Sequence, residues 1–335
     1  MPALDLLVVA ELNLDVIVRT ADGEIPWGQA ETVVPDGLVT LGSSGAITAA
    51  AAARQGMTVA ICAVVGDDDA GRLAIDALRR AGVDTARVRA LPGRRTGMTV
   101  CLTRPDGDRA LLTSLGTMAD LTASDLSAEV LGAARHVHVS SPFLQTRLLP
   151  ELADVLHRAR AAGATTSVDT GWAPHDEWAS IVPALGAVDT LLPNAEECRR
   201  LAAAASGDPA MLQADAEVAA EILAGHGCDV VVKSGGSGAF AVVGGQVIAA
   251  RAAAVDPVDT TGAGDNFDAG WLAARVEGAP AAAALTRAVA SGSFAVRGVG
   301  GTGAMATRDE AVAAAADLPV EVRRSASIRL VREHA

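Results

Sequence analysis

The sequence predicts one α/β domain in which helices cover both faces of a mostly parallel β-sheet. Apolar segments of strand length alternate with helical segments over most of the 335 residues, and this pattern is typical of parallel strands joined by crossover helices. A chain of this length can bury a large core. Half of the residues are hydrophobic but only 2% are aromatic, so we expect a core of Ala, Val and Leu.

The composition narrows the class of protein. The net charge of −13 argues against nucleic acid or an anionic membrane as a partner. The four cysteines stand far apart and match no zinc-site spacing, so they are expected to be buried thiols in a reducing compartment. The N-terminus lacks the basic segment of a secretory signal, and no apolar run is long enough to span a membrane. These features predict a soluble, cytoplasmic protein.

Residues 5–18 begin as a continuous apolar run, as expected for a strand buried on both faces. From Glu11 onward polar and apolar residues alternate, which places Glu11, Asn13 and Asp15 on one strand face. These three side chains are either solvated or form a polar edge that binds a polyol. The residues alone favour solvation.

Two segments in the N-terminal half, residues 12–40 and 93–118, contain short β-prone stretches between glycines and prolines. They are predicted to form small additional strands. The same reading predicts further strands and helices along the chain: strands at 58–65, 137–140, 165–169, 190–193 and 229–233, and helices at 69–81 and 282–297.

Polar residues mark the end of the strand predicted at 137–140. Ser140 is expected at the edge of the sheet where α/β folds bind ligands, and a capping role is the alternative. His136 and His138 alternate along this strand. Their spacing places them on one strand face. A histidine pair could bind a metal, but no acidic third ligand is near in the sequence, so they are predicted to be strand-face histidines without a metal.

A glycine turn in the last third of the chain precedes a helix predicted at 266–276. Gly262, Ala263 and Gly264 leave backbone N–H groups uncovered at the positive end of that helix, which is a typical phosphate site. Asp265 lies at its mouth, where a carboxylate can accept the proton of a hydroxyl that attacks phosphorus. The structural alternative is a tight turn with Asp265 as N-cap.

Residues 259–265, Asp-Thr-Thr-Gly-Ala-Gly-Asp, resemble the C-terminal signature of the PfkB/ribokinase family of carbohydrate kinases. Asn194 and Glu197 have the spacing of that family's Asn-x-x-Glu motif, which is tied to Mg²⁺ and phosphates. The same spacing is also that of a capping box at a helix start. An amide and a carboxylate one turn apart can hold a hydrated Mg²⁺.

Residues 41–49 resemble the family's N-terminal Gly-Gly-x-x-Ala-Asn element only in part. Ser43 stands in place of its second glycine, and Ile47 in place of its asparagine. The loss of that asparagine removes a partner for a substrate hydroxyl, which predicts a substrate other than ribose. A plain junction between strand, turn and helix is the alternative reading.

This resemblance implies a ribokinase-like, three-layer α/β/α fold of one domain spanning residues 1–335, with a small β lid formed by the insertions at 12–40 and 93–118. The implied activity is ATP-dependent phosphorylation of a hydroxyl on a small sugar or sugar derivative, in a homodimer. Catalysis is assigned by this resemblance to the base Asp265 and to the N–H groups of Gly262, Ala263 and Gly264. Sugar binding is assigned to Asn13, Asp15, Gly42 and Ser140. Nucleotide binding is assigned to Asn194, Lys233, Ser234, Gly235, Gly238 and Gly264. Glu197 is assigned to bind Mg²⁺ through water. Asp259 and Thr261 are assigned to a monovalent cation, and the resemblance implies K⁺ as an activator.

The sequence can be compared with three other functions. A nucleoside kinase of the same family is opposed by the shortage of aromatic residues near Asn13 and in the lid, where a base would stack. A non-catalytic sugar or nucleotide sensor is opposed by the intact Asp265 and Asn-x-x-Glu motif. A dehydrogenase that uses the Gly-x-Gly-x-x-Gly at residues 298–303 is excluded, because a helix and not a strand is predicted before it.

Overall fold

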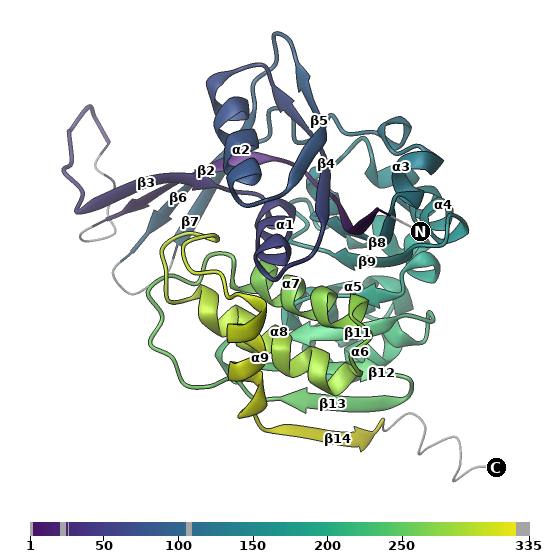
Figure 1. Ribbon diagram of the computed structural model, residues 1–335. Helices are drawn as coiled ribbons and strands as arrows, with labels where there is room; N and C mark the ends of the chain where they lie inside the picture. Colours follow the sequence, from purple (N-terminus) through teal and green to yellow (C-terminus); the bar gives the residue numbers. More distant parts are fainter. Residues whose placement is uncertain (1–2, 21–24, 26, 105–108, 326–335) are drawn as a thin grey trace.

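The computed structural model of the protein describes residues 3–20, 25, 27–104 and 109–325. Ten of the described strands form one sheet in the order β14-β13-β12-β11-β10-β9-β8-β1-β4-β5 (Figure 1). From β5 across to β11 the strands pair in parallel, and β12, β13 and β14 run antiparallel along one edge. The strands are β1 (Leu4–Val9), β4 (Val59–Gly66), β5 (Asp84–Leu91), β8 (Ala134–Ser140), β9 (Thr165–Asp169), β10 (Thr190–Leu191), β11 (Asp229–Lys233), β12 (Ala239–Val243), β13 (Gln246–Ala250) and β14 (Val320–Arg324).

Helices cover both faces of this sheet, so the domain has three layers, α/β/α, as the sequence predicted (Figure 1). One face is covered by α3 (Ala128–Gly132), α4 (Leu152–Ala161), α5 (Ala195–Ser206) and α6 (Ala216–Ala224). The other face is covered by α1 (Ser44–Arg54), α2 (Asp69–Arg80), α7 (Ala263–Val276) and α8 (Ala281–Ala295), with α9 (Arg308–Ala316) packed on α8.

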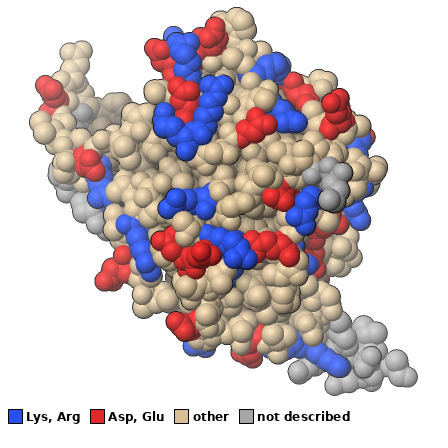
Figure 2. Space-filling view, viewed as in Figure 1, with Lys and Arg blue, Asp and Glu red and all other residues tan. Residues whose placement is uncertain are grey.

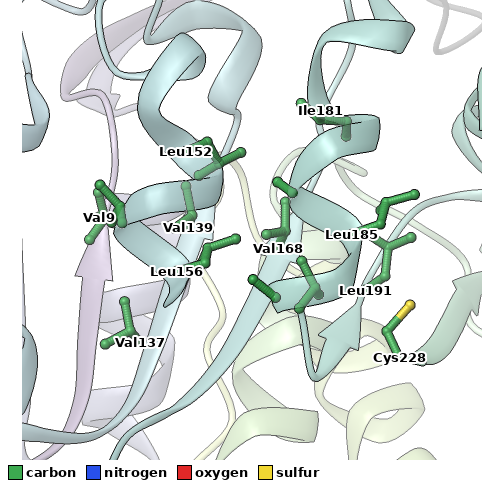
Figure 3. Close-up of a cluster of buried hydrophobic side chains, with 14 of the residues drawn as sticks. Val9, Val137, Val139, Leu152, Leu156, Val168, Ile181, Leu185, Leu191 and Cys228 are labelled. Atoms are coloured by element: carbon green, nitrogen blue, oxygen red, sulfur yellow. The ribbon is translucent and has the colours of Figure 1, made fainter. Parts of the chain in front are cut away.

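Each helical layer has its own hydrophobic core against the sheet. On the first face Val139 and Val168 of the sheet pack with Leu152 and Leu156 of α4 (Figure 3). On the second face the core includes small alanines of α1 and Trp271 of α7. Residues 6–9 of β1 alternate between these two cores and are all fully buried, which explains the continuous apolar run in the sequence.

A second, four-stranded sheet in the order β3-β2-β6-β7 projects from the domain (Figure 1). It consists of β2 (Asn13–Arg19), β3 (Asp36–Leu41), β6 (Gly97–Thr103) and β7 (Arg109–Ser114). β2 follows β1 after residues 10–12, and β3 leads into α1 through Gly42 and Ser43. Several large apolar side chains of this sheet are exposed: Leu38, Val39, Met98, Leu111 and Leu112.

Some predicted elements have different limits in the structure. The strand predicted at 5–18 is two strands, because the chain leaves the main sheet after Val9 and enters the second sheet at Asn13. The helix predicted from residue 266 begins at Ala263, since Gly262 takes the N-cap position. The strands at 165–169 and 229–233 have the predicted limits.

Charged residues of both signs are interspersed on the face shown in Figure 2. The cysteines Cys62, Cys101, Cys198 and Cys228 are free and buried, as predicted. Within the described ranges, no helix is both long enough and apolar enough to cross a membrane.

Candidate active site

The candidate site lies where the carboxyl ends of neighbouring parallel strands meet. β1, β8, β9, β10 and β11 are adjacent in the sheet and run in the same direction. Parallel strands therefore bring the residues at their ends to one edge. At or just after these ends lie Glu11, Ser140, Asp169, Asn194 and Lys233.

The glycine turn before α7 has the geometry of an anion site. Gly262 is the N-cap with φ 73°, and a Cβ there would lie 2.4 Å from the Cα of Gly301. Both the positive φ and this close approach require glycine. The N–H of Ala263 donates to Thr260 O at 3.3 Å. The N–H groups of Gly262, Gly264 and Asp265 have no partner in the described chain, which leaves them available to a phosphate.

Asp265 is buried on the first turn of α7, with 9% of its surface exposed. Burial raises the pKa of its carboxyl to about 7; the charge of Asp169 raises it further, and Lys233 and Ser44 oppose the shift. Thr48 of α1 donates to its backbone oxygen at 3.3 Å, which fixes the turn against α1. A carboxyl with a pKa near neutrality suits a general base.

Three charged residues beneath this turn form a buried cluster that the sequence did not reveal. The Lys233 ammonium lies 3.2 Å from Asp169 Oδ2 and 3.1 Å from Asp268 Oδ2. Burial raises the pKa of Asp268 well above its usual value, whereas the charge of Lys233 lowers the pKa of Asp169 against the effect of its burial. A Cβ on Gly264 would lie 3.6 Å from the Lys233 ammonium, so this cation borders the anion site.

The predicted sugar ligands of the N-terminal region come together. Asn13 Nδ2 donates to Asp15 Oδ1 at 3.0 Å and to Thr99 Oγ1 at 3.3 Å. A Cβ on Gly42 would lie 2.3 Å from that Asp15 oxygen. Burial raises the pKa of Asp15 to about 6. The Asp15 charge also raises the pKa of Asp265, which indicates that the two carboxylates are near one another.

The two departures from the family element at 41–49 are both buried. Ser43 keeps a positive φ of 68° and caps α1 by accepting from the N–H of Ala46 at 3.1 Å. Its hydroxyl donates to Glu11 O at 2.6 Å. Ile47 packs against Gly301, where an added Cβ would lie 2.3 Å from the Ile47 Cδ1. An apolar contact thus stands at the position where the resemblance implies an asparagine.

Asn194 and Glu197 form a complete capping box at the start of α5. Asn194 Oδ1 accepts from the N–H groups of Glu196 and Glu197, and Glu197 Oε2 accepts from the Asn194 N–H at 2.8 Å. Thr170 also donates to Glu197 Oε2. Burial and the Asp169 charge raise the pKa of Glu197 to about 7. Its Oε1 has no hydrogen-bond partner among the described residues, so the cap leaves one oxygen for another ligand.

An open pocket of about 580 Å³ lies beside this helix start and includes Asn194, Lys233 and Ser234, three of the predicted nucleotide residues. The glycines of the adjoining loop differ in role. Gly238 has φ 103° and approaches Ala250 O, so no side chain fits there. Gly235, with φ 57°, faces open space.

Asp259 links two loops at the other side of the turn. Its Oδ1 accepts from Thr261 N and Oγ1, and its Oδ2 accepts from the N–H of Gly300 at 2.8 Å. From the second sheet, Arg109 donates to Thr261 Oγ1 at 2.7 Å. Arg109 was not predicted as a site residue, and its contact joins elements 152 residues apart in sequence.

Residues 4–308 match the family described as pfkB family carbohydrate kinase. The chain belongs to this family. This assignment confirms the predicted class of enzyme, a carbohydrate kinase, and the family predicted from residues 259–265.

Relatives and solved structures agree with the assignment. The kinase is 30% identical to the ATP-dependent ribose-1-phosphate kinase of Halopiger xanaduensis over 86% of its length and 90% of that protein. It is 27% identical to the ribokinase of Bacillus subtilis over 91% of its length and 97% of that protein. The structure of Arabidopsis thaliana ribokinase with ribose and ATP matches 93% of this kinase and 99% of that chain, with a TM-score of 0.78 and 26% identity. A structure from E. coli with the same fold (TM-score 0.76, 22% identity, covering 92% of this kinase and 97% of that chain) contains ATP and Mg²⁺.

The histidines of β8 are structural in the kinase. His136 hydrogen-bonds Thr165 and Ser167, and His138 also bonds Ser167. Within the described residues no group of three His, Cys, Asp or Glu side chains is placed to hold a metal directly.

Proposed function

We propose that this kinase transfers the γ-phosphoryl group of ATP to a hydroxyl of a small sugar or sugar derivative. The observation that supports it most is the start of α7, where free N–H groups and a buried carboxylate occupy one turn. Mg-ATP supplies the phosphoryl group. Asp265 accepts the proton of the attacking hydroxyl, and Gly262, Gly264 and Asp265 donate backbone hydrogen bonds to the phosphate oxygens. Ala263 was predicted as a donor together with Gly262 and Gly264, but its N–H donates to Thr260 O instead.

Sugar binding is assigned in this proposal to Asn13, Asp15 and Gly42, whose contacts converge at the base of the second sheet. That sheet acts as the lid, and it excludes water from the phosphoryl acceptor. Arg109 supports this role, because it connects the sheet to Thr261 beside the phosphate turn.

The nucleotide and cation sites are assigned to residues on the other side of the glycine turn. The pocket of Asn194, Lys233 and Ser234, with Gly235 and Gly238 in its loop, receives the nucleotide. The free Oε1 of Glu197 fits a water-bound Mg²⁺. Asp259 and Thr261, which join two loops, are the proposed K⁺ region.

The proposal extends to assembly and location. Exposed apolar residues of the second sheet, including Val39, Leu111 and Leu112, support a homodimer through the lids. Four buried free thiols fit the reducing cytoplasm.

An ADP-release assay with Mg-ATP tests the activity. The acceptors are ribose, fructose, 2-dehydro-3-deoxygluconate, inositol-derived acids and nucleosides, each with and without K⁺. We expect release with at least one sugar. Release with nucleosides alone would replace the substrate by a nucleoside, and no release with any acceptor would favour a sensor.

A further inference from the structure

Buried polar atoms without partners gather at the carboxyl ends of β1 and β8. Among the described residues, Glu11 Oε2, Ser140 Oγ, Gln145 Oε1 and His138 Nε2 are buried and make no hydrogen bond. Glu11 is 2% exposed and Ser140 is fully buried. A buried polar atom without a partner is costly, so such atoms are expected to meet a ligand or an ordered water.

Two contacts place Glu11 at the substrate end of the site. A Cβ on Gly45 would lie 2.3 Å from Ala10 Cβ and 3.1 Å from Ser140 Cβ, so the chain just before Glu11 converges with Ser140 at the start of α1. The charges of Asp265 and Asp169 contribute to the raised pKa of the Glu11 carboxyl, which agrees with a place near the proposed base.

Ser43 holds Glu11 in this position. Its hydroxyl donates to Glu11 O at 2.6 Å and also interacts with the Glu11 carboxyl. Ser43 keeps a φ of 68°, a conformation that is costly for serine. Strain of this kind persists where the surroundings impose it, often at functional sites.

We infer that Glu11 is a specificity residue of the kinase that binds an uncharged hydroxyl of the sugar, with Ser140 as its neighbour in the same subsite. The inference rests on the proposed function and adds Glu11 to the sugar ligands predicted from the sequence, which already include Ser140. Burial raises the pKa of Glu11 well above its usual value, which favours the neutral acid. In that form the carboxyl can both donate and accept hydrogen bonds. The hydroxyl groups of a sugar diol can likewise accept and donate hydrogen bonds, so they match this carboxyl. An anionic group placed there would meet the charges of Asp169 and Asp265.

Steady-state kinetics with the best acceptor from the ADP-release panel test this inference. Glu11→Ala should raise the sugar KM about ten-fold or more, since a buried partner is lost, and should leave the KM for Mg-ATP unchanged. Glu11→Gln keeps a donor and an acceptor, so its sugar KM should stay close to that of the wild type.

Two serines provide a matched control that does not depend on the Glu11 variants folding. Ser140→Ala removes a buried hydroxyl without a partner, and should raise the sugar KM while leaving the melting temperature unchanged or higher. Ser167→Ala removes a buried hydroxyl that both His136 and His138 contact. It should lower the melting temperature and leave the sugar KM unchanged.

The outcomes separate this inference from the proposed function. Turnover with an unchanged sugar KM in Glu11→Ala and Ser140→Ala would overturn the inference alone and assign the unpaired atoms to buried water. Equal increases in both KM values would also overturn it, in favour of a structural role. A panel without any turnover would overturn both.

Discussion

The phosphoryl end and the sugar end of the site are built from different parts of the chain. At the phosphoryl end the proposed ligands are backbone N–H groups, fixed by the φ of Gly262 and its contact with Gly301. At the sugar end the proposed ligands are side chains, such as Asn13 and Asp15, on a strand that leaves the main sheet. A site made of backbone tolerates few substitutions, whereas a site made of side chains changes with each residue. The sugar end can therefore diverge while the phosphoryl end is kept.

The largest expected effect is at the phosphoryl end. Asp265→Asn should fold normally but lose turnover by about 10²-fold or more, the scale usual for removal of a general base. ADP release at saturating substrates measures this. Asp309→Asn, a change at an exposed residue of α9, is the control. Wild-type turnover in Asp265→Asn would show that Asp265 is not the general base.

The second prediction tests the backbone geometry of the phosphoryl end. Gly262→Ala should lower the free energy of unfolding by roughly 2–5 kcal/mol, because strain at a positive φ adds to a clash with Gly301, and should reduce turnover. Gly278→Ala is the matched control. Gly278 lies just beyond the other end of α7 and has a φ of 87°, but a Cβ there would have open space. Gly278→Ala should lower the free energy of unfolding only by the backbone strain, roughly 1–2 kcal/mol. Equal losses in both variants would show that the contact with Gly301 is unimportant.

The third prediction separates a metal role of Glu197 from its capping role. Glu197→Gln keeps the capping box but removes the charge, so the Mg²⁺ concentration for half-maximal activity should rise roughly ten-fold at a melting temperature no lower than that of the wild type. Glu310→Gln makes the same change in the capping box of α9, far from the site in sequence. It should leave the Mg²⁺ titration unchanged. If Glu197→Gln also leaves the Mg²⁺ titration unchanged, Glu197 has only the capping role.

The fourth prediction concerns the cost of keeping the base buried. The pKa of Asp265 rises from 3.8 to about 7 on folding, so the folded state binds more protons than the unfolded state between these values. Its contribution to stability therefore falls as pH rises through that window. Asp265→Asn should melt roughly 4 °C above the wild type at pH 8, with no difference near pH 4. A constant difference across thermal scans at pH 4–8 would contradict the assigned pKa.

The smallest effect is expected at the sugar end. Ser43→Gly relieves the strained φ but loses the bond to Glu11, and these changes should cancel to within about 1 kcal/mol. The sugar KM should nevertheless rise roughly three-fold, because Glu11 loses a partner. A denaturant titration and the sugar KM measure the two quantities. An unchanged KM would separate Ser43 from sugar binding.

The fold and the glycine turn at the start of α7 could be predicted from sequence because both depend on local patterns. The run at residues 6–9 indicates a strand between two cores, and residues 259–265 contain the whole turn in one segment. The end of β1 at Val9 was missed, because alternation continues through residues 10–12 although the chain changes sheets there.

The missed contacts join distant segments. Lys233 was assigned to the nucleotide from its loop, but its ammonium also binds Asp169 and Asp268 from two other elements. No spacing in the sequence connects these three residues. Glu11 was visible as a polar residue on the strand, but its burial beside Ser140 depends on how β1 and β8 meet α1.

The short connections of the second sheet have a practical consequence for engineering. β2 is attached through residues 10–12, and β3 through Gly42 and Ser43, so the same joints that attach this sheet also hold proposed ligands of the sugar. An exchange of this module between relatives should therefore transfer acceptor preference only when the joints are exchanged with it. A chimera cut at Asn13 and Leu41 would exchange Asn13 and Asp15 but leave Glu11 and Gly42 behind, so its acceptor preference should match neither parent.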